Sequence, residues 1–530
     1  MKFYTNKASY KNKDSVLLLI EAASNIKNAQ LTVYQLNEII IRKEIIITSG
    51  LTEINLGQFT DNLSGYYATL KIENNLFTTA FSIDSDEKII RYGFLCDFEK
   101  SSFNSDIKWM NLMNLNYIQF YDWSYTHHQF ISEENEYKDM MGKKNNLKVI
   151  MDKILECKKC GMRPMAYGPV YAADKTFYET HKESAYYSHE KEPLTFIKIF
   201  YLMNIGLDCS WYQNIISQYK KSIDKIGFSG IHMDTYGYPK RALDSKGKIR
   251  DLEKDFPIFV DKVSKEIPHI PLIFNNVGAW PLGKIMDCKQ KAIYIEVWPP
   301  FETYYHLRQL IEKASLSGKP IILAAYIAAF RCDRPNALYS ALFATFCINT
   351  LGATHLFLGE EGCVITQGYY CDYEKLNNLE LANIKTYQDF FVFYQQLLFN
   401  PKLKDITMTH CGGDNQEYVI RGNYSLTCES EKISVIIRSD GKTHLIILEN
   451  LENNNNKWNK GKIEPKISSQ LTFEIQVFKK IESVYSAIPN SKNFLPSKLD
   501  FIRKKGPHSD LICFKTPKFK VGTIIWFKEK

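Results

Sequence analysis

The chain has 530 residues, 45% of them hydrophobic and 24% charged, which is the composition of folded domains rather than of a disordered chain. Its 67 Lys and Arg exceed its 59 Asp and Glu by eight, and no basic stripe accompanies this small excess, so we expect no nucleic-acid partner. The longest nearly apolar run, Ile321–Phe330, is about half as long as a membrane helix, so we expect no membrane-spanning segment.

Residues 1–90 have the pattern of short β-strands. Apolar runs such as Ser15–Ile20 and Leu31–Leu36 are separated by polar clusters, and Thr32 and Tyr34 alternate with apolar neighbours. Several strands at this spacing predict an immunoglobulin-like β-sandwich. Titratable residues do not cluster here, so we expect a supporting or ligand-contacting domain.

Residues 91–402 predict a (β/α)8 TIM barrel, because eight short apolar runs alternate with amphipathic helical segments. A doubly wound open sheet is the alternative, but the sequence has neither a G-x-G-x-x-G turn nor a Walker A motif. A last helix is expected over 383–399, before Pro401. The eight predicted strands are Tyr92–Phe98, Tyr117–Trp123, Arg163–Val170, Gly230–Thr235, Pro271–Val277, Ala292–Trp298, Pro320–Ile327 and Thr354–Gly359.

The pattern of short strands returns over 403–530, in runs such as Lys432–Ile437 and Thr523–Phe527. These strands predict a second β-sandwich. The fold class is therefore multidomain, α/β plus all-β, with a barrel flanked by two β-sandwich domains. The longest barrel connection, Tyr171 to about Gly227, is rich in aromatic residues and would supply a binding cleft.

Carboxylic acids end three of the predicted barrel strands. Because side chains alternate along a strand, Asp234 points into the barrel when Ile231 and Met233 pack against helices, and Glu296 points inward in the same way. Asp122 is placed inward by its parity with Ile118 and Phe120. Active sites of such barrels lie at the carboxyl ends of the strands, so we expect these acids to converge.

Two converging carboxyl groups are what hydrolysis of a glycosidic bond needs. Trp298 beside Glu296 is expected to raise the pKa of that carboxyl, which suits a general acid. His232 and Thr235 are expected to keep Asp234 ionised, as a nucleophile must be. The alternative for each acid is a hydrogen-bonded or ion-paired carboxylate at the barrel rim.

Other polar and aromatic residues at strand ends are candidates for binding sugar hydroxyls and ring faces, with a structural role as the alternative for each. Asn275, Glu360 and His128 belong to this group. We expect no cofactor and no metal, because Cys157 and Cys160 form a C-x-x-C without a second ligand pair. The substrate-binding candidates chosen on these grounds are His127, Tyr167, His232, Asn276, Trp298 and Tyr326.

The motifs Ile231–Gly237 and Tyr294–Pro299, together with Phe120–Trp123, resemble the dextranases of glycoside hydrolase family 66. The resemblance spans the barrel and implies endo-hydrolysis of α-1,6-linked glucan, as dextran or isomaltooligosaccharides, by a retaining double displacement. It implies that Asp234 is the nucleophile, that Glu296 is the acid/base and that Asp122 binds the sugar at the cleavage point.

One departure and two alternatives accompany this resemblance. Ser229 stands where the family usually has Asp, but strand parity points it away from the lumen, so we expect little effect on the chemistry.

The first alternative is a transglycosylase that forms cyclic or elongated isomaltooligosaccharides. Cyclising members carry an inserted binding module, and no barrel connection here would hold one, which favours the hydrolase. The second alternative is a non-catalytic glucan-binding protein.

Twelve cysteines are scattered from Cys96 to Cys513, which is more typical of a reducing compartment than of a secreted protein. The N-terminus has no apolar leader pattern. We therefore expect a cytoplasmic protein, or a secreted one if a leader has been removed.

Overall fold

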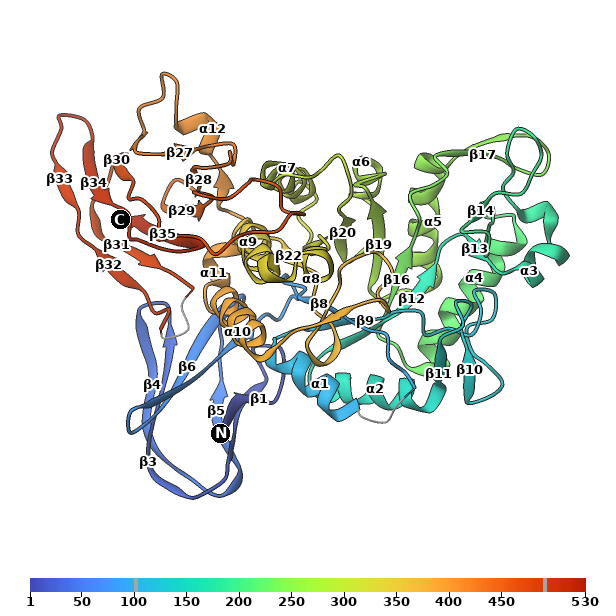
Figure 1. Ribbon diagram of the computed structural model, residues 1–530, viewed down its shortest axis with the longest axis horizontal. Helices are drawn as coiled ribbons and strands as arrows, with labels where there is room; N and C mark the ends of the chain where they lie inside the picture. Colours follow the sequence, from blue (N-terminus) through green and yellow to red (C-terminus); the bar gives the residue numbers. More distant parts are fainter. Residues whose placement is uncertain (100–102, 490–492) are drawn as a thin grey trace.

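The computed structural model describes residues 1–99, 103–489 and 493–530. Figure 1 shows N-terminal strands in blue, a central region of alternating strands and helices, and C-terminal strands in red. The central region is a parallel barrel and the flanking regions are antiparallel sheets, so the predicted fold class is confirmed. No helix in these ranges is long and apolar enough to cross a membrane.

Two antiparallel sheets form the N-terminal region and enclose one apolar core. Alternate residues of β2, such as Val16, Leu18 and Ile20, are fully buried and pack with Leu31 and Val33 of the other sheet. The first sheet has the order β1 (Lys2–Thr5), β2 (Ser15–Ala22), β5 (Gly50–Gln58), and the second has the order β4 (Glu38–Ile47), β3 (Ile26–Gln35), β6 (Ser64–Ile72), β7 (Asn75–Ile83).

The barrel contains all eight predicted strands in parallel, each paired with its neighbour in chain order. The ring closes where Phe94 bridges Gly359, through a bond of 3.3 Å from the Phe94 N–H to the Leu358 carbonyl. A Cβ at position 359 would collide with the Phe94 ring, so this seam requires glycine. The strands are β8 (Tyr92–Leu95), β9 (Tyr117–Phe120), β12 (Arg163–Pro169), β16 (Gly230–Asp234), β19 (Leu272–Val277), β20 (Ala292–Glu296), β21 (Ile321–Ala324) and β22 (Thr354–His355).

Helices follow the strands and cover the outside of the barrel with their apolar faces. In α5, Phe256, Phe259, Val260 and Val263 recur at helical spacing and are buried in the core between helices and barrel. The principal helices are α1 (Phe103–Leu112), α2 (Leu147–Lys159), α4 (Ser210–Lys221), α5 (Leu252–Glu266), α6 (Leu282–Ile285), α7 (Tyr304–Ser315), α9 (Ala337–Thr350), α10 (Asn378–Phe393) and α11 (Gln395–Leu398).

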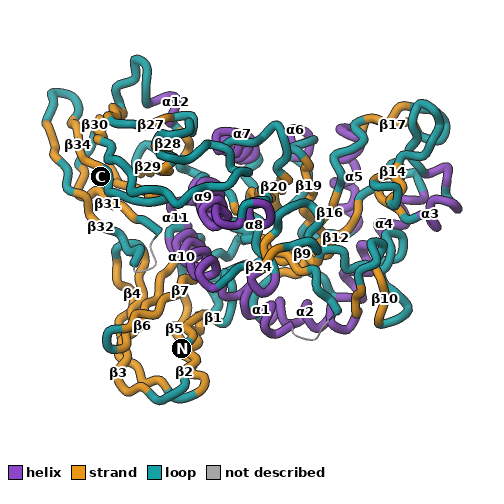
Figure 2. Tube along the Cα trace, viewed as in Figure 1, coloured by secondary structure: helices purple, strands orange, loops and turns teal. Residues whose placement is uncertain are grey.

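Small elements extend the barrel connections that follow β9 and β12. A hairpin of β10 (Glu136–Lys138) and β11 (Lys144–Asn146) follows β9, and the longer excursion after β12 contains a 3-10 turn, Lys182–Ser184, and four further short elements. Figure 2 shows these segments gathered at the end of the molecule opposite the C-terminal strands. The four elements are β13 (Ala172–Ala173), α3 (Lys175–Thr180), β14 (Thr195–Phe196) and β15 (Phe200–Leu202).

The C-terminal region again has two antiparallel sheets around an apolar core that includes Ile446 and Phe473. The barrel is attached to it by Arg308 of α7, which donates two hydrogen bonds of 2.7 and 2.8 Å to Asp405. One sheet has the order β25 (Lys404–Asp405), β28 (Ile433–Ser439), β29 (Thr443–Asn450), β35 (Gly522–Glu529), β31 (Ile481–Ala487), β32 (Ser497–Leu499); the other has β26 (Tyr418–Arg421), β30 (Thr472–Val477), β34 (Asp510–Lys515), β33 (Ile502–Lys504).

Candidate active site

A cavity of about 550 Å³ opens at the carboxyl ends of the barrel strands. This is the end at which barrel enzymes carry out chemistry. Its lining combines carboxylic acids, amides and many aromatic rings, a mixture suited to a ligand with hydroxyl groups and apolar ring faces. The lining includes Tyr121, Asp122, Met141, Tyr167, Phe196, Ile197, Phe200, His232, Asp234, Tyr236, Asn275, Glu296, Trp298, Tyr326, Gly368, Tyr369 and Tyr370.

Asp234 and Glu296 are the last residues of β16 and β20, and both side chains line the cavity. Ile231 and Met233 pack in the core between barrel and helices, as Ile293 does on β20. Strand alternation therefore directs the two acids to the cavity, as the sequence predicts.

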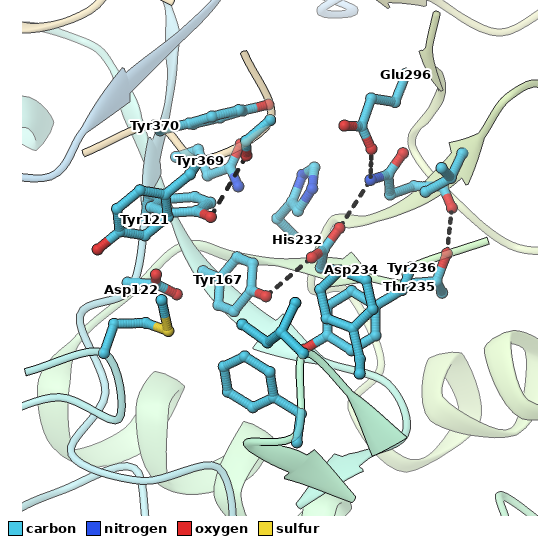
Figure 3. A pocket seen from close by; sticks show the side chains of 18 of the residues that line it. Tyr121, Asp122, Tyr167, His232, Asp234, Thr235, Tyr236, Glu296, Tyr369 and Tyr370 are labelled. Carbon is cyan, nitrogen blue, oxygen red and sulfur yellow. Dashed lines mark hydrogen bonds between the residues drawn. The ribbon is translucent and has the colours of Figure 1, made fainter. Parts of the chain in front are cut away.

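Asn275 of β19 joins the two acids by hydrogen bonds. Figure 3 labels Asp234 and Glu296 and marks the bonds that reach them with dashed lines. The Asn275 amide nitrogen donates to Asp234 Oδ1 at 2.7 Å and to Glu296 Oε2 at 2.9 Å. These two carboxylate oxygens are therefore at most 5.6 Å apart. Three adjacent strands, β16, β19 and β20, supply the three side chains, so the rigid sheet sets the separation.

Each acid also accepts a tyrosine hydroxyl. Tyr167 of β12 donates to Asp234 Oδ2 at 2.9 Å, and Tyr326, which follows β21, donates to Glu296 Oε1 at 2.8 Å. Tyr370 lies next to Tyr326, with 3.4 Å between the hydroxyl oxygens. All four carboxylate oxygens of the pair are thus oriented by neighbouring donors.

Burial shapes the electrostatics of this pair. Desolvation, followed by the nearby Glu296, raises the pKa of Asp234 to about 7. Desolvation also raises the pKa of Glu296, against the hydrogen bonds from Asn275 and Tyr326. Because the two groups repel each other when both are ionised, they titrate as a pair that retains one proton close to neutral pH.

His232 does not ionise Asp234 in the way the sequence suggests. Burial lowers the pKa of His232 to about 3, so the imidazole is uncharged, and its Nδ1 lies 3.1 Å from the Tyr92 hydroxyl in the barrel lumen. The expectation that His232 keeps Asp234 ionised is therefore wrong. The hydroxyl and amide donors from Tyr167 and Asn275 stabilise the carboxylate instead.

Asp122 reaches the cavity by a different route from the predicted one. Ile118 and Phe120 face the helices, while Tyr121 packs toward the barrel interior, so the predicted parity is wrong. Asp122 follows the end of β9 and has φ of +48°, and this left-handed turn brings its carboxyl to the cavity. Burial, followed by the charge of Asp139, raises the pKa of Asp122 to about 7.

Among the predicted residues, Tyr167, His232, Trp298 and Tyr326 line the cavity, and so does Asn275. Four others, Asn276, Glu360, His127 and His128, do not line it.

Asn276 points away from the cavity, since its amide donates to the Phe274 and Tyr294 carbonyls. Parity explains the difference, because consecutive residues of β19 face opposite sides. Glu360 is buried behind the cavity wall, where it accepts the Asp97 N–H at 2.9 Å.

His127 stands behind the wall of the main cavity. Its ring stacks on Phe200 at 4.9 Å, and its Nδ1 lies 3.1 Å from the Ala172 carbonyl. It borders a small neighbouring void with Asp122 rather than the cavity itself. His128 pairs with Asp174, which caps the N-terminus of α3.

Several wall residues escaped the sequence reasoning because they lie on connections rather than strands. The segment after β22 contributes Gly368, Tyr369 and Tyr370, and a Cβ at Gly368 would lie 3.3 Å from Glu296 Oε1. The two hairpins contribute Met141 and Phe196. The Tyr-Tyr pair and the aromatic content of the long excursion were the available signals. Within the described ranges, no three His, Cys, Asp or Glu are grouped so that they could hold a metal ion.

Comparison with known proteins agrees with this geometry. The model of the family described as glycosyl hydrolase family 66 matches residues 5–525. The chain belongs to glycosyl hydrolase family 66. A cycloisomaltooligosaccharide glucanotransferase of Niallia circulans is 22% identical to this family 66 chain over 368 residues, which are 62% of the chain and 38% of the relative. The match thus spans well under half the length of that relative.

Solved structures show the same fold. A Paenibacillus sp. cycloisomaltooligosaccharide glucanotransferase complexed with cycloisomaltoheptaose superposes with a TM-score of 0.89 at 17% identity, over 99% of both chains. An alpha-amylase of Geobacillus thermoleovorans complexed with acarbose has a TM-score of 0.51 at 10% identity, over 84% of this chain and 98% of that one. At these identities the likeness concerns the fold alone.

Proposed function

We propose that this family 66 chain is a retaining glycoside hydrolase that cleaves internal α-1,6-glucosidic bonds of dextran or isomaltooligosaccharides. The observation that carries the retaining mechanism is the shared Asn275 amide, which holds the Asp234 and Glu296 oxygens within 5.6 Å of each other. Retaining enzymes need carboxyl groups about 5–5.5 Å apart, whereas inverting enzymes need about 6.5–9.5 Å to admit a water molecule.

In the first step, the Asp234 carboxylate attacks the anomeric carbon and the bond to the glycosidic oxygen breaks. Glu296 gives its proton to that oxygen, and the reducing-end part of the glucan leaves as an alcohol. In the second step, a water molecule transfers a proton to Glu296 and its oxygen attacks the same carbon. The bond to Asp234 breaks, and the anomeric configuration is restored.

In the free site burial raises the pKa of both acids, which favours retention of a proton on the pair. The first step requires that this proton be on Glu296 and that Asp234 be ionised when the sugar is bound. Tyr167 and Asn275 donate to Asp234 and stabilise its anion. Trp298 and Gly368 line the cavity beside Glu296.

The substrate class rests on the relatives and on the cavity. The named relatives act on or bind α-1,6-linked glucose rings, by their names. The cavity offers hydroxyl and carboxyl groups for sugar hydroxyls, and the aromatic lining residues Trp298 and Tyr369 offer apolar surface for the C–H faces of glucose. We propose Asp122 as a binding residue for the unit that is attacked.

Rates on dextran test the roles of the two acids. We expect Asp234→Gly and Glu296→Gln each to lose more than about 10³-fold of the rate of reducing-end release. NMR of the first product should show the α-anomer. A near-wild-type rate for either variant, or an initial β-anomer, would contradict the retaining assignment.

Transglycosylation is the second candidate, because the Niallia circulans relative and the Paenibacillus protein are both named as glucanotransferases. It shares the first step and differs only in the acceptor, which is a sugar hydroxyl instead of water. Chromatography of the products formed from pure dextran separates the two: linear oligosaccharides indicate hydrolysis, and cyclic or elongated ones indicate transfer. Dextran binding by calorimetry without any products would indicate a non-catalytic glucan-binding protein.

We also propose a reducing compartment, the cytoplasm, as the place of action. All twelve cysteines are unpaired thiols, and Cys157, Cys347 and Cys428 are buried among apolar groups. Fractionation of the producing cells tests this proposal, and activity found only outside the cells would contradict it.

A further inference from the structure

A short hairpin at the edge of the cavity presents a side chain for which the mechanism gives no role. Strands β14 and β15 pair antiparallel, with Phe196 opposite Phe200. The Ile199 N–H donates to the Phe196 carbonyl at 3.2 Å, which closes a tight turn. Ile197 and Lys198 are its two central residues.

Both central residues adopt a left-handed backbone, with φ of +46° at Ile197 and +63° at Lys198. Tight hairpin turns of this kind normally contain Asn, Asp or Gly at these positions. A β-branched residue there is a steric outlier, because its side chain is crowded by the following carbonyl. The requirements of the turn therefore do not explain why residue 197 is isoleucine. Such backbone outliers are concentrated at functional sites.

Aromatic stacking fixes the hairpin beside the catalytic acids. Phe196 stacks on Tyr236 with ring centres 4.1 Å apart and planes at 9°, and Tyr236 follows Asp234 by two residues. Phe200 stacks on His127 at 4.9 Å and 10°. These two contacts hold both strands of the hairpin, so the tip between them has a defined position.

Ile197 lies at this tip and lines the cavity, and 52% of its surface is exposed. Lys198, its neighbour in the same turn, does not line the cavity. A second hairpin contributes another aliphatic side chain, Met141, which is 39% exposed. The carboxylate of Asp139 holds that turn by accepting the Met141 and Lys143 N–H groups, each at 2.9 Å.

Ile197 belongs to the side of the cavity that holds the glycone. Glu296 protonates the leaving oxygen, so the leaving group extends past Glu296 and Trp298. The β14–β15 hairpin instead packs on Tyr236, beside the nucleophile Asp234. This assignment of sides depends on the proposed function.

We propose that Ile197 is a specificity-determining residue that contacts the second glucosyl unit of the glycone, next to the unit attacked by Asp234. An α-1,6 linkage places a methylene group between successive rings, and an exposed aliphatic side chain buries that apolar surface. The contact selects chains over single glucosyl groups, because Ile197 is half exposed at the cavity edge whereas Asn275 and Glu296 are buried at its base.

The test compares Ile197→Asn with Lys198→Asn. Asn tolerates the left-handed backbone at both positions, so both variants should fold and melt at or above the wild-type temperature. Only Ile197→Asn removes a side chain that lines the cavity. The substrates are p-nitrophenyl α-isomaltoside, which has two glucosyl units, and p-nitrophenyl α-glucoside, which has one.

We expect Ile197→Asn to lower the isomaltoside-to-glucoside ratio of kcat/KM by about fivefold to tenfold, the effect of a lost apolar contact in a pocket. The glucoside value should stay within twofold of wild type, and Lys198→Asn should keep the wild-type ratio. If wild type cleaves dextran but neither aryl glycoside, isomaltohexaose and isomaltotriose replace them.

An unchanged ratio in Ile197→Asn overturns the inference while leaving the proposed function intact. An equal loss on both substrates together with a lowered melting temperature shows a structural role and also overturns it. If wild type cleaves none of these substrates, the proposed function fails, and the inference fails with it.

Discussion

The strand ends and the connections of the barrel contribute to the cavity in different ways. Asp234, Asn275 and Glu296 stand on three adjacent strands, where backbone pairing fixes their relative positions. The wall residues Met141, Ile197 and Tyr370 stand on hairpins and on the segment after β22. The strands thus carry the proposed chemistry and the connections carry the proposed selectivity, a division common in barrel enzymes.

The variant Asn275→Ala tests most directly whether the strand ends carry the chemistry. The variant removes the amide that donates to both carboxylates, and we expect kcat on dextran to fall about 10²- to 10³-fold, the usual effect of losing one oriented donor. Because the amide bonds lower the pKa of both acids, their pKa values should rise and the acidic limb of the pH profile should move to higher pH. If KM rises and kcat stays at the wild-type value, the Asn275 amide does not orient the two acids for catalysis.

Gly368→Ala tests whether the segment after β22 must approach Glu296 closely for catalysis. The added Cβ would lie 3.3 Å from Glu296 Oε1 and 3.4 Å from the Trp298 ring, so the segment or the acid must shift. We expect kcat to fall about tenfold, as a small displacement of an oriented group does. Gly283→Ala is the matched control, since its Cβ would meet nothing within 4 Å. Equal rates in the two variants would show that catalysis does not require the close approach of Gly368 to Glu296.

Tyr326→Phe removes one donor and leaves the ring in place. The Tyr326 hydrogen bond lowers the pKa of Glu296, so its loss raises that pKa. Glu296 must be protonated in the first step, so the basic limb of kcat/KM should move to higher pH by up to about one unit. The rate at the optimum should fall only a few-fold. A shift to lower pH would contradict the assignment of Glu296 as the acid.

The smallest expected effect is on stability. Lys198→Asn replaces a residue with φ of +63° by one that tolerates this backbone, and should raise the free energy of unfolding by about 0.5 kcal/mol. Urea unfolding of the variant and of wild type measures the difference. A clear destabilisation would show that the Lys198 side chain stabilises the turn.

The sequence predicts the strand-borne part of the site well, because alternation along β16 and β20 is a local property. The eight strands and the inward direction of Asp234 and Glu296 follow from apolar periodicity alone. Asp122 reaches the cavity through a left-handed residue after the strand ends, which no periodicity encodes.

One strand position is also ambiguous from the sequence: Asn276 and Asn275 are indistinguishable by residue type, and only the register of β19 decides which one faces the cavity.

Connections are harder to predict, because their positions depend on contacts distant in the chain. Glu360 is directed away by backbone donors from the β8 side, at Cys96 and Asp97. The wall at Ile197 depends on the stacking of Phe196 and Phe200 on partners elsewhere in the chain.

The seam between β8 and β22 has a consequence for the order in which heating damages the enzyme. β22 is only two residues long, and Phe94 and Gly359 complete the ring with little backbone pairing. Tyr369 of the cavity lining follows this joint along the chain. Warming should therefore disorder the segment around Tyr369 before it displaces Asp234 and Glu296, which end strands that are paired on both sides.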